Sequence, residues 1–89
     1  MQTHQLGTIL RVVPVDLSDG DFTDETGFFI RIGTETELSF CPINNKTDAE
    51  AITKTWPASE KFDDPVLCRK IFATGELEEP TDLYIGYGV

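Results

Sequence analysis

The chain has 89 residues and a mass of 9.9 kDa, enough for one domain and too few for two. Its 16 acidic residues outnumber 7 basic ones and leave a formal charge of -9, which disfavours contact with the phosphates of nucleic acid. No apolar run approaches the roughly 20 residues of a membrane span, and the first five residues lack the form of a secretory signal. We therefore expect one domain, residues 1–89, made in a cytosol, with no membrane segment and no direct nucleic-acid partner.

The first half of the chain predicts three strands. Residues 8–15 are rich in β-branched side chains, and Pro14 suits an edge position or a strand end. Residues 16–27 are dense in turn formers and acids, so we expect a loop there. Residues 27–33 have the two-residue period of a half-buried strand, in which one face carries Phe28, Ile30 and Ile32. Residues 35–43 follow a turn and predict a third strand, paired as a hairpin with residues 27–33.

Residues 47–56 can be read in two ways. Thr47 and Glu50 have the spacing of a capping box, which would begin a helix. The β-branched side chains that follow favour a strand, in which Ile52, Lys54 and Trp56 share a face with Glu50. We favour the strand and keep the helix as the alternative.

The last third of the chain predicts a loop and two strands. Residues 57–65 are polar and bounded by prolines, so we expect a surface loop held by Phe62. Residues 66–74 and 81–87 predict strands that pair as a hairpin across an acidic turn at residues 75–80. Six short strands, separated by turns and loops, predict an all-β fold, a small antiparallel β-sandwich or barrel.

The sequence offers little for catalysis. His4 is the one histidine and lies in a terminal stretch, which disfavours a nucleophilic triad. Carboxylates are abundant, but a module of this size has little room for the cleft that paired-carboxylate chemistry needs. Cys41 and Cys68 belong to no CxxC pair, so we expect buried thiols and leave a disulfide open. We expect no enzyme activity, no catalytic residues and no cofactor.

Acidic residues gather at three places in the chain. Asp19 and Asp21 flank a glycine and are followed by Asp24 and Glu25, so a hard cation such as Ca²⁺ is an alternative to a solvated turn. The spacing of an EF-hand loop is missing, and we favour the turn without a metal. Residues 63–64 and 76–79 are the other two groups, which could form a face toward a basic partner.

The chain has nine aromatic residues, more than a thin core can hide. Aromatic side chains carry much of the energy of buried contacts, so some are expected at an interface. For Trp56 and Phe62 a core position competes with an interface position, and Trp56 with Tyr84 or Tyr87 could instead form a platform for carbohydrate. The basic pair Arg69–Lys70, which interrupts the otherwise apolar strand at residues 66–74, could form a salt bridge between subunits. The interface candidates are Trp56, Phe62, Arg69, Lys70, Tyr84 and Tyr87.

The C-terminal third resembles the end of many small virion proteins of tailed bacteriophages. The residues that carry the resemblance are 62–75, FDDPVLCRKIFATG, and 82–87, DLYIGY. The shared pattern is a Pro-Val-x-x-Arg-x-Ile-x-Ala-Thr-Gly strand and turn that leads into a final strand. Here Glu76–Leu77–Glu78–Glu79–Pro80 replaces the usual small residues after the turn, which makes it longer and more acidic.

The resemblance implies a β-rich structural protein of the capsid-decoration (cement), head-fibre or spike-base type. Such proteins bind the major capsid protein or other virion subunits, often as trimers, and they offer no catalytic residues to transfer. We therefore expect a capsid decoration protein that stabilises the shell through contacts between subunits. The alternative, suggested by charge, is a small acidic inhibitor that mimics nucleic acid against a host defence protein.

Overall fold

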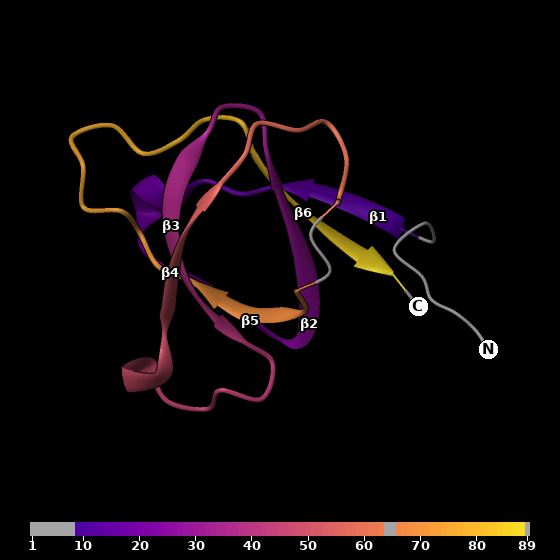
Figure 1. Cartoon of the computed structure of the whole chain (residues 1–89), viewed down its shortest axis with the longest axis vertical. Helices are drawn as coiled ribbons and strands as arrows, with labels where there is room; N and C mark the ends of the chain where they lie inside the picture. Colours follow the sequence, from indigo (N-terminus) through magenta and orange to yellow (C-terminus); the bar gives the residue numbers. More distant parts are fainter. Residues whose placement is uncertain (1–8, 64–65, 89) are drawn as a thin grey trace.

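The computed structural model of the chain describes residues 9–63 and 66–88. The strands in that part are β1 (Ile9–Pro14), β2 (Phe22–Ile32), β3 (Thr36–Pro42), β4 (Ile52–Trp56), β5 (Cys68–Ile71) and β6 (Leu83–Gly88). They form one six-stranded antiparallel sheet with two short 3-10 helices, Leu17–Asp19 and Asp48–Glu50, in the connections (Figure 1). The all-β prediction is confirmed. The sheet does not close into a barrel, so of the two predicted architectures the sandwich is the one that fits.

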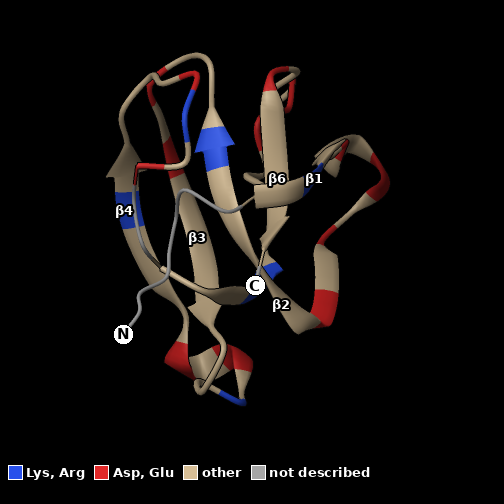
Figure 2. Cartoon of the chain, turned by 90° about the vertical axis from the view of Figure 1, so that its right-hand side faces the viewer, with Lys and Arg blue, Asp and Glu red and all other residues tan. Residues whose placement is uncertain are grey.

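The long strand β2 joins the two parts of the sheet, whose strand order is β1-β6-β2-β5-β3-β4. Its first half pairs with β5, and its second half, residues 29–32, pairs with β6. The register shifts between Thr23 and Phe28, where Gly27 has a φ of 98° that favours glycine. Figure 2 shows β3 and β4 on one side of β2 and β1 and β6 on the other.

The apolar side chains of both parts meet in one core. The predicted inward face of β2 is confirmed, because Phe28, Ile30 and Ile32 are at most 1% exposed. Leu38 and Phe40 of β3 are buried as well. The other buried apolar residues of this cluster are Val15, Leu17, Trp56, Cys68, Ile71, Leu83 and Ile85.

Both predicted hairpins are wrong. β5 lies between β2 and β3, and β2 lies between β5 and β6, so neither pair of consecutive strands is directly bonded. β5 is short and buried along most of its length, and a central position pairs its backbone groups on both sides. The turn after β2 is tied instead to the start of β6, because Gly33 N donates to Asp82 O at 3.0 Å and Thr34 Oγ1 donates to Asp82 Oδ2 at 2.7 Å.

The predicted loop at residues 16–27 is too long. Only its first part is irregular, and β2 begins at Phe22, whose ring meets Phe28 edge to face at 5.2 Å. Two acidic residues in this part of the strand have partners from elsewhere in the sheet. The Asp24 carboxylate accepts a hydrogen bond from Tyr87, and the Glu25 carboxylate faces Arg69.

Both alternatives for residues 47–56 occur in the structure, in succession. The capping box forms, with Thr47 N donating to Glu50 Oε1 at 3.1 Å, but it caps only one 3-10 turn. The strand β4 then pairs with β3 and places Lys54 Nζ over the ring of Trp56, as two residues on one face of a strand require. The favoured strand is confirmed from Ile52 onward.

Candidate functional site

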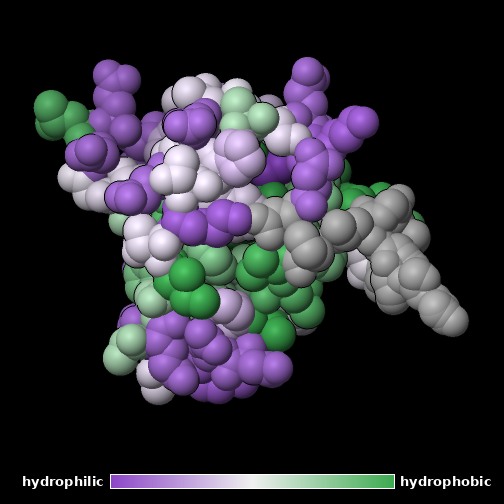
Figure 3. All heavy atoms as spheres, viewed as in Figure 1, coloured by the Kyte–Doolittle hydropathy of each residue, from purple (hydrophilic) through white to green (hydrophobic). Residues whose placement is uncertain are grey.

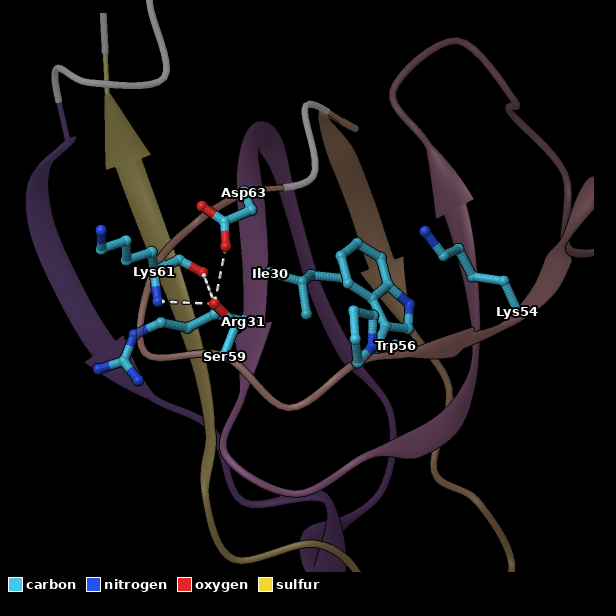
Figure 4. A pocket seen from close by; sticks show the side chains of 8 residues that line it. Ile30, Arg31, Lys54, Trp56, Ser59, Lys61 and Asp63 are labelled. Carbon is cyan, nitrogen blue, oxygen red and sulfur yellow. Dashed lines mark hydrogen bonds between the residues drawn. The ribbon is translucent and has the colours of Figure 1, made fainter.

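A hollow of about 350 Å³ lies between β2, β4 and the loop that follows β4 (Figure 4). Ile30, Trp56 and Pro57 supply its apolar walls, and Ser59 supplies a hydroxyl. Arg31, Lys54, Lys61 and Asp63 line it as well. Three of the seven basic residues of this acidic chain therefore gather around one hollow, with one acidic residue among the described residues of its lining.

The loop of residues 57–63 is held in a defined shape by Ser59. Its backbone N donates to Ile32 O at 2.9 Å, which extends a parallel bridge between Ile32 and Ala58. Its hydroxyl donates toward Lys61 O and Asp63 Oδ2, and accepts from Lys61 N at 3.0 Å. These bonds fix the side of the hollow opposite β4.

Phe62 anchors the same loop on the outer face of β6, as predicted for this loop. A side-chain carbon added at Gly86 would lie 2.8 Å from Phe62 Cζ, so only a glycine leaves room for the ring. The Arg31 guanidinium lies over the rings of Tyr84 and Phe62, at 4.3 and 5.6 Å from their centroids. Stacking of this kind leaves the edge of the guanidinium, where its N–H groups point, available to an acceptor.

Trp56 forms the floor of the hollow and belongs to the core. It is 2% exposed and meets Phe40 edge to face at 5.6 Å. Of its two predicted positions the structure shows the core position, and the carbohydrate platform is wrong because a buried ring offers no exposed face. Its indole Nε1 is buried and has no hydrogen-bond partner among residues 9–63 and 66–88. Figure 4 shows Lys54 on one side of Trp56 and the side chains of Arg31 and Lys61 on the other.

Arg69 and Lys70 lie on β5, outside the described lining of this hollow, and have acidic partners within the chain. Arg69 is 6% exposed, donates from Nε to Asn45 O at 2.6 Å and lies 3.5 Å from Glu25 Oε2. The Lys70 ammonium lies 3.0 Å from Asp48 Oδ2. Both side chains therefore have ion pairs inside one subunit.

Tyr87 and Asp24 connect β6 with the first half of β2. The Tyr87 hydroxyl donates to Asp24 Oδ2 at 2.5 Å, while Asp24 Oδ1 accepts from Thr26 N. Burial, together with this hydrogen bond to a carboxylate, raises the pKa of Tyr87 to about 12. The bond from Tyr87 also lowers the pKa of Asp24. Arg11 lies over the Tyr87 ring at 4.9 Å.

The acidic residues considered as a cation site point to separate partners. Asp21 Oδ1 accepts from Ala73 N, Asp24 is bound to Tyr87, and Glu25 faces Arg69. In residues 9–63 and 66–88, no group of three His, Cys, Asp or Glu side chains is placed to share a metal ion. Figure 2 shows the acids mainly in turns and loops, where water solvates them.

The two cysteines are buried. Cys41 and Cys68 have 0% exposure and form no disulfide, so they are thiols of the core. His4 lies outside the described residues, as does Asp64 from the acidic pair 63–64. Within the described part, no helix is long and apolar enough to cross a bilayer.

Sequence reasoning missed the hollow itself. Its walls come from strands that are not neighbours in the sheet order, so no local pattern marks them. It also missed Leu77, which the sequence places inside an acidic turn and the structure leaves wholly exposed. A lone leucine among glutamates was the available signal.

Comparison with known proteins gives no relative: no family model, no curated protein and no solved structure matches the chain.

Proposed function

We propose that this protein is a non-enzymatic structural component of a tailed-bacteriophage particle, most specifically a decoration or cement protein of the capsid. In this role it is made in the host cytoplasm, joins the virion, and binds the major capsid protein or a neighbouring virion subunit. The resemblance of residues 62–75 and 82–87 to small virion proteins supports the proposal. The surface of the fold supports it independently.

The observation that carries the proposal is the apolar edge strand β1. It is the last strand on its side of the sheet, and its side chains Leu10 and Val12 are 70% and 48% exposed. An edge strand presents unpaired backbone groups, and exposed apolar side chains on it favour pairing with another chain. A protein that works by binding neighbours in a shell uses such an edge.

The same strand limits how far that pairing extends. Val15 N donates to Leu83 O in β6, so by alternation the backbone of Val12 and Pro14 points away from the sheet. Pro14 has no N–H and ends the run of donors, as expected for a proline at an edge. The free edge is therefore short, which favours a directed contact with one partner over continued sheet growth.

Incorporation into particles tests the proposal. The gene is tagged in the genome that encodes it, particles are purified on a density gradient, and the tag is measured in the particle peak. We expect the protein in that peak at a fixed ratio to the major capsid protein, and a reduced ratio for Leu10→Ser combined with Val12→Ser. Expression in the lysate with no tag in the particle peak would refute the proposal.

A second candidate, an acidic inhibitor that mimics nucleic acid, is favoured by one feature. Glu35, Glu37, Glu76 and Glu78 line a second hollow of about 450 Å³ on the surface. Such a group of carboxylates could receive basic side chains of a nucleic-acid-binding protein. Binding to a host nuclease that weakens steeply between low and physiological salt would favour this candidate over the first.

A further inference from the structure

The loop between β5 and β6 carries an apolar tip. Leu77 is fully exposed, with a relative exposure of 105%, and its neighbours Glu76 and Glu78 are exposed too. Figure 3 shows a hydrophobic tip beside hydrophilic side chains on this loop, at the upper left of the molecule. A leucine in this setting contributes nothing to the core of its own chain.

The tip is held in a fixed shape. The Glu79 carboxylate accepts hydrogen bonds from Thr74 N and Thr74 Oγ1, both at 2.9 Å, and from Gly75 N at 3.0 Å. Gly75 has a φ of 81°, in the region that favours glycine, and this turns the chain toward the tip. A loop ordered before binding loses less conformational entropy on binding, so this one is suited to recognition.

The hollow beside Trp56 has the complementary character. Pro57 is its exposed apolar side chain, and Ile30 and Trp56 form a floor that is almost fully covered. Its volume of about 350 Å³ is ample for a leucine side chain. Lys54 lies on one flank and Arg31 and Lys61 on the other, as Figure 4 shows, and Asp63 is the acidic residue of the described lining. Basic residues therefore outnumber acidic ones around the hollow, whereas the tip offers an apolar side chain between two acidic ones.

We propose that the Leu77 tip of one copy of this chain docks in the Trp56 hollow of a second copy. Leu77 would lie against the apolar walls, and Glu76 and Glu78 would meet the basic side chains on the flanks. This deepens the proposed function and rests on it, because subunits of a shell must contact one another. The tip and the loop of residues 57–63 lie on opposite sides of the molecule (Figure 1), so one copy cannot fill its own hollow.

A contact between two different surfaces of the same chain is heterologous. Each copy keeps one free tip and one free hollow until the assembly closes, so the products are rings or open chains. A closed ring of few copies is compatible with the trimer implied by the virion proteins that the C-terminal third resembles.

The first test is self-association of the full chain, measured by sedimentation equilibrium across a dilution series. Leu77→Ser should weaken association about ten- to a hundredfold, the effect of losing one buried leucine side chain. Leu67→Ser is the matched control, because it removes another exposed leucine that lies neither in the hollow nor on β1, and it should leave association unchanged. Lys61→Glu should weaken association severalfold, more at low salt, and Lys46→Glu makes the same charge change away from the hollow.

Mixing the variants makes the test specific. Leu77→Ser keeps an intact hollow and Lys61→Glu keeps an intact tip, so an equimolar mixture should form one-to-one dimers more tightly than either variant alone. Circular dichroism shows whether each variant is folded, which we expect because both residues are exposed. Two results would overturn the inference: a wild-type protein that stays monomeric at all concentrations, or a Leu67→Ser variant that weakens association as much as Leu77→Ser.

The two proposals fail in distinguishable ways. If Leu77→Ser abolishes self-association but the wild type never enters particles, the contact stands and the virion role falls. If the protein enters particles and Leu77→Ser changes neither its association nor its incorporation, the virion role stands and the contact falls.

Discussion

Replacing Trp56 by Ala should destabilise the protein strongly, whereas replacing it by Phe should cost little stability or add some. The indole is 2% exposed and packs edge to face on Phe40, so truncation to Ala should cost about 3–5 kcal/mol in the free energy of unfolding. Phe keeps the ring against Phe40 and loses only the outer part of the indole, a loss of roughly 0.5–1.5 kcal/mol by comparison with small deletions in cores.

The Phe variant also removes a group that is costly to bury. Trp56 Nε1 has no hydrogen-bond partner in the part of the chain that the structure describes, and a buried unpaired donor costs about 1–3 kcal/mol. The two terms oppose each other, so Trp56→Phe should lie between about 0.5 kcal/mol less stable and about 2.5 kcal/mol more stable than the wild type. The measurement is urea unfolding at 25 °C followed by far-ultraviolet circular dichroism, because Trp56 is the one tryptophan and fluorescence would be lost with it.

Equal slopes of the unfolding curves are required for the comparison, because a changed slope would mean a changed unfolded state. A Phe variant that loses as much stability as the Ala variant would refute the reasoning. It would mean that the indole N–H is bound to an acceptor that contributes to the fold.

Three further predictions concern the Tyr87–Asp24 pair, Glu79 and two glycines. Tyr87→Phe should remove the absorbance titration at 295 nm near pH 12. In the wild type, the raised pKa of Tyr87 makes the stability of the fold decrease as the pH rises from the ordinary tyrosine value of 10 to about 12, and the lowered pKa of Asp24 makes stability decrease as the pH drops through that lowered value. Glu79→Gln should speed hydrogen exchange at the two backbone amides that bind its carboxylate while leaving the unfolding midpoint nearly unchanged, and slow exchange in the variant would contradict this. Gly27→Ala should lower stability by more than about 1 kcal/mol in the same urea assay, and by more than Gly20→Ala, because both glycines have positive φ but only the first is crowded by a neighbouring side chain.

Several features of the fold follow from local sequence alone. The alternation in residues 27–33 placed Phe28, Ile30 and Ile32 inward, because successive side chains of a strand point to opposite faces whatever its partners are. Pro14 marked a strand edge because a residue without an N–H cannot serve a central strand. Phe62 was expected to hold its loop, and the structure shows its ring on Gly86.

Strand order and the two surfaces of interest were decided only by tertiary structure. The insertion of β5 between β2 and β3 depends on backbone pairing between segments far apart in the chain, which no local pattern encodes. The same long-range pairing turned Arg69 and Lys70 toward acids of their own subunit and buried Trp56. The hollow forms where β2, β4 and the loop of residues 57–63 come together. Leu77 is exposed in a loop whose ends are held by hydrogen bonds from residues 74 and 75 to the Glu79 carboxylate. Local sequence thus determined which side chains face inward, whereas contacts between distant segments determined what those side chains meet.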